Sequence, residues 1–183
     1  LYLHFEVIPD NLPDKLKATL IRFPPNSLQF EIGVQTFDPE IQQRISRKQN
    51  NQKTCENIAW LRENTGAHLH VDLIFGLPGD TLENFAHSFD QLAGLNPHEI
   101  QLGILKRLRG APINRHTEAY DLRYNPKTPY NILSTSTVDF STLQRINRLA
   151  RFWDMIGNSG RFAYTLPLLL GEQPFNRFLQ LSD

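Results

Sequence analysis

The chain has 183 residues, of which 40% are hydrophobic and 21% are charged. This is the balance of a globular protein with a buried core. Nineteen basic residues offset nineteen acidic ones, so the composition does not indicate binding to nucleic acid or to an anionic membrane. No apolar run reaches the roughly 20 residues that a membrane-spanning helix needs. The single cysteine, Cys55, excludes an internal disulfide and agrees with a reducing, cytoplasmic location.

Strand-like and helix-like segments alternate along the first part of the chain. Four short apolar runs predict strands, and each of the first three is followed by a helical pattern. The predicted strands cover residues 3–8, 28–35, 68–75 and 99–106. The predicted helices cover residues 13–22, 51–64 and 81–95, with a further short one that begins at Asp38 and Pro39. This order predicts an α/β fold with a parallel sheet.

The pattern changes after Pro112. Residues 113–140 read as mostly irregular, because two prolines in this stretch prevent a long helix. A capping box at Ser141 and Gln144 predicts a helix that ends near Ile156, and a last helical stretch covers 162–181. We therefore expect two domains: an α/β unit at 1–112 and an α-helical unit at 113–183, anchored by aromatic residues such as Phe152 and Trp153.

The four predicted strands each have one apolar and one polar face. Alternate residues of a strand point to opposite sides, and the polar sides carry the residues His4, Glu6, Gln29, Glu31, Gly33, Gln35, His68, His70, Asp72, Gln101 and Gly103. A doubly wound sheet covered on both faces has almost continuously apolar strands instead. The pattern favours a partial (β/α) barrel with a polar, ligand-binding interior; the alternative is an α/β sheet with one solvated face.

Two strings carry a resemblance to a known family. FEIGVQTFDPEIQQRISRKQ, followed by DLIFGLPGD, resembles the second half of the radical S-adenosylmethionine (radical SAM) core. The resemblance is to the type found in oxygen-independent coproporphyrinogen oxidase and in cobalamin-binding radical enzymes. NPKTPYNILST resembles the uncharacterised C-terminal domain of some cobalamin-binding members. The resemblance implies strands three to six of a partial parallel barrel, followed by a helical domain.

The same resemblance implies which residues bind the cofactor. Glu6 matches a glutamate that contacts S-adenosylmethionine, Gln35 matches the glutamine of a GVQ motif, and Arg47 matches an arginine that reaches the cofactor. Asp72 matches the first residue of the DLIxGLP motif. Gly103 to Leu105 match the last strand of the core, with Gly103 and Leu105 beside the adenine. A carboxylate can accept hydrogen bonds from an ammonium or ribose hydroxyl, and a guanidinium can pair with a carboxylate.

The sequence departs from the family at the metal cluster. The CxxxCxxC loop and the glycine-rich motif of the second strand are absent, so we expect a fragment of a longer enzyme. The full-length enzyme would use a 4Fe–4S cluster to cleave S-adenosylmethionine and start radical chemistry of an oxidoreductase or methyltransferase type. The resemblance leaves open whether it also uses cobalamin. The fragment alone is expected to be inactive. Its substrate is an unidentified small molecule.

The missing strands predict an exposed edge at the first strand. We expect this edge either to mediate dimer formation or to be covered by the C-terminal helices.

Two other functions fit the residues without the resemblance. One is a non-catalytic α/β binding module. The other is a small metal-dependent α/β hydrolase that uses His4, His68 and His70, because histidines at alternate strand positions can ligate zinc.

Overall fold

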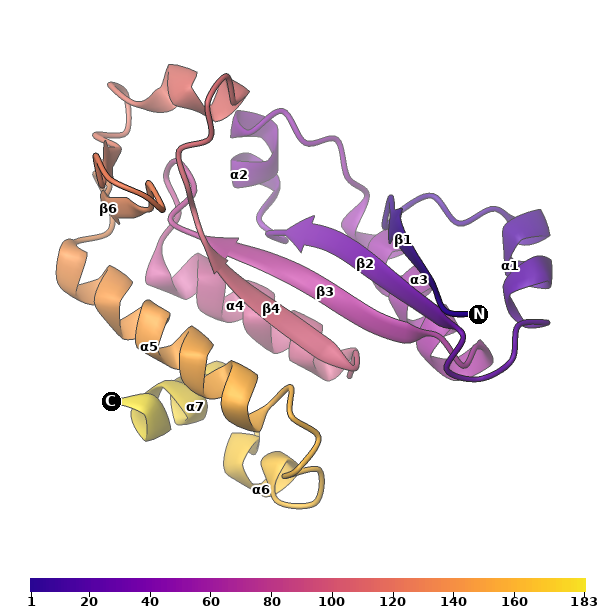
Figure 1. The fold of residues 1–183 in the computed structure, drawn as a ribbon. Helices are drawn as coiled ribbons and strands as arrows, with labels where there is room; N and C mark the ends of the chain where they lie inside the picture. The colour runs from indigo at the N-terminus through magenta and orange to yellow at the C-terminus, as the bar shows by residue number, and fades with distance from the viewer.

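The structure, a computed structural model that describes residues 1–183, is built on a parallel sheet (Figure 1). Its four strands have the order β1-β2-β3-β4. They are β1 (Leu3–Val7), β2 (Leu28–Gln35), β3 (His68–Phe75) and β4 (Glu99–Ile104). The spatial order equals the chain order, as expected for consecutive β-α units. The α/β class with an open parallel sheet is confirmed, and the sheet does not close into a barrel.

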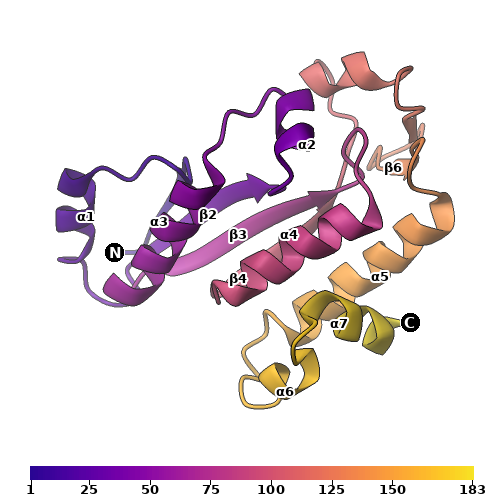
Figure 2. The ribbon, with the colours of Figure 1, turned by 180° about the vertical axis from the view of Figure 1, so that it is seen from behind.

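Helices cover one face of this sheet and leave the other bare. The connections contain α1 (Asp14–Leu20), α2 (Pro39–Arg44), α3 (Asn51–Asn64) and α4 (Leu82–Gly94). Seen from behind, α3 and α4 lie across the sheet (Figure 2), whereas the face turned to the viewer in Figure 1 carries no helix.

The helix starts follow local capping chemistry. Asp38 accepts hydrogen bonds from the backbone N–H groups of Glu40 and Ile41 at the start of α2. Thr81 accepts one from Asn84 at the start of α4. Each side chain thereby satisfies donors that the helix itself leaves free.

Burial alternates along the central strands, as the sequence predicts. In β2, Phe30, Ile32 and Val34 are buried, with 3%, 1% and 0% of their surface exposed. The residues between them are only half-buried, and β3 shows the same alternation. The apolar side packs under α3 and α4 and forms the core. The polar side faces the open space of a half-barrel.

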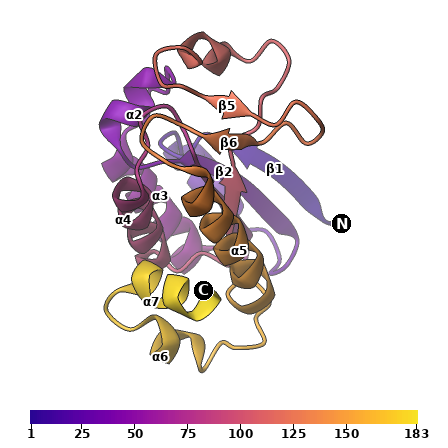
Figure 3. The same ribbon diagram turned by 90° about the vertical axis from the view of Figure 1, so that its left-hand side faces the viewer.

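The C-terminal part first crosses the carboxyl ends of the strands and then descends beside the sheet (Figure 3). It comprises the 3₁₀ helix η1 (Pro112–His116), strands β5 (Arg123–Tyr124) and β6 (Ile132–Ser134), and helices α5 (Phe140–Ile156), α6 (Leu166–Leu170) and α7 (Pro174–Ser182). The antiparallel β5–β6 pair lies in the stretch expected to be irregular. The capping box predicted at Ser141 is wrong: α5 starts earlier, because Asp139 accepts the N–H of Thr142.

Aromatic side chains fix these helices to the sheet domain. The ring of Trp153 on α5 meets Phe89 of α4 edge-on at 4.8 Å and Phe178 of α7 at 5.0 Å. Phe175 of α7 packs in turn against Phe85 and Phe89. The predicted anchoring role of Trp153 is confirmed. No helix in the structure combines the length and the apolar character needed to cross a bilayer.

The two edges of the sheet differ. On the β4 edge, the side-chain amide of Asn158 accepts from the N–H of Ile100 at 3.0 Å and donates to its C=O at 3.1 Å. At the other end of β4, Ile132 donates its N–H to the C=O of Leu105 at 2.8 Å. The β1 edge has no such cover. The expectation that C-terminal helices shield β1 is wrong, because α5 and α7 pack on β4 and α4 at the opposite side.

Candidate functional site

Two adjoining clefts open at the carboxyl ends of the strands, where parallel β/α folds place their ligands. The first, here called the polar cleft, has a volume of about 430 Å³ and is lined by Glu6, Val7, Ile8, Pro9, Asp10, Glu31, Gly33, Gln35, Arg47, Lys48, Gln49 and Asp72. The second, the apolar cleft, has a volume of about 370 Å³ and is lined by Gln35, Asp72, Leu73, Ile74, Gln101, Gly103, Ile104, Leu105, Lys106, Leu108, Ala111 and Ile113. Gln35 and Asp72 line both and therefore join them.

Gln35 owes its position to an irregular end of β2. The strand register shifts between Gly33 and Gln35, and Gln35 has a left-handed backbone with φ of 70°. A non-glycine residue in this region costs about 1–2 kcal/mol. Gly33 gives the side chain room to fold back, since a Cβ there would lie 2.7 Å from Nε2 of Gln35. The buried Oε1 of Gln35 has no hydrogen-bond partner within the protein.

Arg47 reaches the polar cleft from the connection between α2 and α3. The buried side chain of Gln42 ties this connection to the end of β2, because its Nε2 donates to the C=O of Thr36 at 2.8 Å and to Asn51 at 2.7 Å. The Arg47 guanidinium then donates to the C=O of Gly33 and, at 2.9 Å, to Gln49. Burial lowers the pKa of Arg47, and Asp10 opposes that shift.

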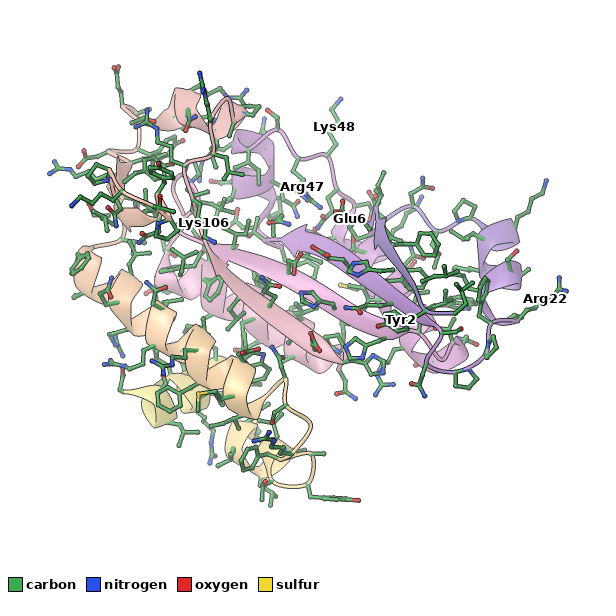
Figure 4. The ribbon with its side chains drawn as sticks, viewed as in Figure 1. Tyr2, Glu6, Arg22, Arg47, Lys48 and Lys106 are labelled. Atoms are coloured by element: carbon green, nitrogen blue, oxygen red, sulfur yellow. The ribbon has the colours of Figure 1, made fainter.

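The entrance to both clefts is edged by charged residues from different elements. In Figure 4, Glu6 and Arg47 lie close together above the ends of β1 and β2, with Lys48 beyond them, whereas Lys106 stands at the end of β4. The polar cleft has four carboxylates in its lining, namely Glu6, Asp10, Glu31 and Asp72. It has two cations, Arg47 and Lys48. Its lining therefore favours a ligand with a net positive charge that also carries an anionic group.

The turn Gly76-Leu77-Pro78-Gly79 shapes the rim, as the sequence indicates. Both glycines have positive φ, 88° and 74°. Asp80, with 2% of its surface exposed, closes the turn by accepting the N–H groups of Gly76 and Thr81 at 3.2 and 3.0 Å. Desolvation by burial raises the pKa of Asp80 to about 7. This carboxylate holds the loop and does not line either cleft.

All six residues inferred from the resemblance lie in these two clefts. Glu6 and Arg47 line the polar cleft, Gly103 and Leu105 line the apolar cleft, and Gln35 and Asp72 line both. Their assignment to cofactor binding stays a prediction. The polar-face pattern also predicted Glu31 and Gln101. Asp10, Lys48 and Ile113 were not predicted, because they lie outside the strands, and Lys106 was not predicted, because it stands on the apolar side of the predicted fourth strand, which ends at Ile104 in the structure.

The histidines of the polar face pair with carboxylates. His4 lies 3.1 Å from Glu31, and Glu99 lies between His68 at 3.1 Å and His70 at 2.9 Å. No group of three or more potential ligands in the structure is arranged to hold a metal ion. Cys55 lies on α3 outside both clefts, with its Sγ 3.2 Å from Nε2 of Gln91.

The fold and the site define a parallel half-barrel with a ligand cleft at its carboxyl end. Comparison with known proteins gives the family: residues 7–92 match the Radical SAM superfamily, and residues 118–183 match a protein family of unknown function (DUF4080). This match, the relatives and the solved structures together support a radical SAM superfamily member.

Relatives agree with this assignment. The oxygen-independent coproporphyrinogen III oxidase of Paracoccus denitrificans is 38% identical over 71 residues, 39% of this chain and 16% of that protein. The heme chaperone HemW of Bacillus subtilis is 29% identical over 129 residues, 70% of this chain and 29% of that protein. The chain thus spans less than a third of the length of either relative.

Solved structures share the fold. The coproporphyrinogen III oxidase HemN of Escherichia coli superposes with a TM-score of 0.60 at 23% identity, over 88% of this chain and 33% of that chain. The radical S-adenosylmethionine methyltransferase TsrM of Kitasatospora setae, with tryptophan substrate and a cofactor analogue bound, superposes with a TM-score of 0.57 at 17% identity. That match covers 71% of this chain and 26% of TsrM.

Proposed function

We propose that the joined clefts bind S-adenosylmethionine, and that residues 1–112 serve as part of the cofactor-binding core of a radical SAM enzyme. The observation that carries the proposal is the division of the site into a polar cleft and an apolar cleft that meet at Gln35 and Asp72. S-adenosylmethionine has the matching division, with a charged methionine end and a flat, weakly polar adenine.

The residues of the polar cleft suit the methionine and ribose end. Glu6 and Asp72 would accept hydrogen bonds from the ammonium or the ribose hydroxyls, and Arg47 would pair with the carboxylate. The excess of carboxylates over cations in this cleft complements a ligand whose sulphonium and ammonium outnumber its single carboxylate.

The apolar cleft suits the adenine. Gly103 adds no side chain to this cleft, and Leu105 and Ile113 contribute apolar side chains to its lining. Burial of a flat ring between such groups removes apolar area from water. Together the two clefts would fix the cofactor's orientation and exclude water from it.

The residues present do not fit the iron–sulphur cluster of the family. A 4Fe–4S cluster takes cysteine thiolates, and the only cysteine, Cys55, lies half-buried on α3 outside the clefts. When bound, such a cluster supplies the electron for cleavage of S-adenosylmethionine. These residues would position the cofactor, and the cluster would require ligands other than those in this chain. The reaction type, oxidoreductase or methyltransferase, and the use of cobalamin belong to the whole protein.

Equilibrium dialysis of radiolabelled S-adenosylmethionine against the 183-residue chain tests the proposal. We expect saturable binding that weakens at least fivefold in Glu6→Gln and in Arg47→Gln, because each loses one charge-assisted contact. The matched controls are Glu63→Gln and Arg161→Gln, which alter exposed side chains outside both clefts. Thermal unfolding confirms that each variant is folded. Absence of saturable binding, or equal losses of affinity in the site and control variants, would contradict the proposal. The alternative would then be a non-catalytic module that binds another ligand.

A further inference from the structure

A chain of ionisable side chains runs along the polar face away from the clefts. It begins at Asp72, whose Oδ1 lies 3.1 Å from Nε2 of His70. The other ring nitrogen of His70, Nδ1, lies 2.9 Å from Oε2 of Glu99 on β4. The remaining oxygen of Glu99, Oε1, lies 3.1 Å from Nε2 of His68. His70 therefore stands between two carboxylates on neighbouring strands, one of which lines both clefts.

This geometry fixes the protonation state of His70. Neutral imidazole carries a proton on only one ring nitrogen, whereas both are donors in imidazolium. Each nitrogen of His70 lies within 3.1 Å of a carboxylate oxygen, so the neutral form would leave one nitrogen lone pair close to a negative charge. Nε2 also lies 2.6 Å from Oε1 of Gln101. The carboxylate of Asp72, with Gln101 and Glu99 adding to it, raises the pKa of His70 to about 9 despite burial.

The neighbouring His98 shows that the raised pKa of His70 depends on its position between the carboxylates. Its ring stacks on His68 with a centroid distance of 4.8 Å, and its Nδ1 accepts the backbone N–H of Leu69 at 3.0 Å. Burial, together with Arg62 and His68, lowers the pKa of His98 to about 4. Two histidines at the same sheet are thus held in opposite states, one charged and one neutral.

Only one carboxylate oxygen of Asp72, Oδ1, lies against His70. Oδ1 is buried, and its angle to Nε2 of His70 does not make a regular hydrogen bond. The contact is therefore an ion pair, and the side chain keeps 20% of its surface exposed toward the clefts. Glu31, the register partner of His70 on β2, adds negative charge on the same face. Without a cation at His70, the carboxylates of Asp72, Glu99 and Glu31 would repel one another.

We infer that His70 is a positioning residue of the cleft: as an imidazolium between Glu99 and Asp72, it holds the Asp72 carboxylate in place and turns it toward the ligand. The inference rests on the proposed function, because it gives Asp72 the task of accepting from a cationic ligand. His70 does not line either cleft and acts through Asp72 alone.

A double-mutant cycle on the full chain tests the inference, with S-adenosylmethionine as the probe in equilibrium dialysis. We expect His70→Gln and Asp72→Asn each to weaken binding at least fivefold at pH 7. The double variant should bind no more weakly than Asp72→Asn alone, since His70 acts through Asp72. His87→Gln, an exposed histidine on α4, is the matched control and should stay within twofold. Additive losses, or unchanged binding by His70→Gln, would overturn the inference.

The pH dependence of S-adenosylmethionine affinity separates a charged His70 from one that only supports the fold, since a purely structural role would give no pH dependence. The ratio of affinities of the unmodified chain and His70→Gln should be constant from pH 6 to 8 and fall toward one as pH rises through about 9. Titration of the ligand itself is common to both proteins and cancels in this ratio. A ratio that stays constant beyond pH 10 would count against the imidazolium.

A separate measurement keeps the inference testable if the chain binds no S-adenosylmethionine. Nitrogen-15 NMR of the imidazole ring should show both nitrogens of His70 protonated at pH 7, with a midpoint near 9. Asp72→Asn should lower that midpoint by at least one pH unit, because it removes the carboxylate beside Nε2. A midpoint near the ordinary value of 6.5 would overturn the inference independently of the proposed function.

Discussion

Among the acidic residues, Asp80 is the one whose burial lowers the free energy of unfolding most at neutral pH. Its folded-state pKa is about 7 against an ordinary 3.8, so the folded chain binds this proton more tightly than the unfolded chain. The contribution to the free energy of unfolding is therefore full below pH 3.8 and is lost as pH rises toward 7. Each unit of pKa difference corresponds to about 1.4 kcal/mol.

Asp80→Asn removes this titration and also one of two acceptors for backbone N–H groups. We expect the variant to be less stable than the unmodified chain by about 1–3 kcal/mol at pH 5, because one N–H of Gly76 or Thr81 loses its partner. The deficit should shrink at pH 8, where the unmodified chain carries the buried charge. Urea denaturation at both pH values measures the two differences. A deficit that grows with pH would show that Asp80 is stabilised as an anion.

At the scale of elements, the β1 strand has the one sheet edge without cover. Leu1, Tyr2, Phe5 and Ile8 expose 103%, 56%, 47% and 67% of their surface. Exposed edges with apolar side chains favour pairing with another strand. We predict a concentration-dependent dimer through β1, which Phe5→Glu shifts toward monomer. Sedimentation velocity over a range of concentrations measures the equilibrium. Phe140→Glu, at a residue 54% exposed on α5, is the control and should dimerise normally.

The elements that could be predicted are those with a period in the sequence. Alternation along β1, β2 and β3 predicted the strands, their polar face and the side on which Glu6, Gln35 and Asp72 lie. The β5–β6 pair has two and three residues, too few for any pattern. The start of α5 was misplaced because Ser141 and Asp139 both resemble caps. The contacts of His70 depend on the register between β3 and β4, which no local signal reports.

At the scale of the whole molecule, the cysteine content limits the chemistry. We predict that anaerobic reconstitution of this chain with iron and sulphide leaves no stable 4Fe–4S cluster, because one thiol cannot replace several cysteine ligands. Visible absorption and iron analysis after desalting measure the outcome. Cys55→Ser should give the same residual signal. A stoichiometric cluster on the monomer would refute the prediction, and S-adenosylmethionine cleavage would then have to be measured on this chain alone.

Asn158 blocks the β4 edge of the sheet against pairing with a further strand. Its amide takes both hydrogen-bonding groups of Ile100, just as an added strand would, and Ile132 engages the other end of the same edge. Each molecule therefore has one exposed sheet edge, at β1, that can pair with another strand, and one blocked edge, at β4. A dimer that forms through β1 exposes only the two blocked β4 edges to solution. Edge-to-edge association therefore stops at the dimer and does not continue into a fibre.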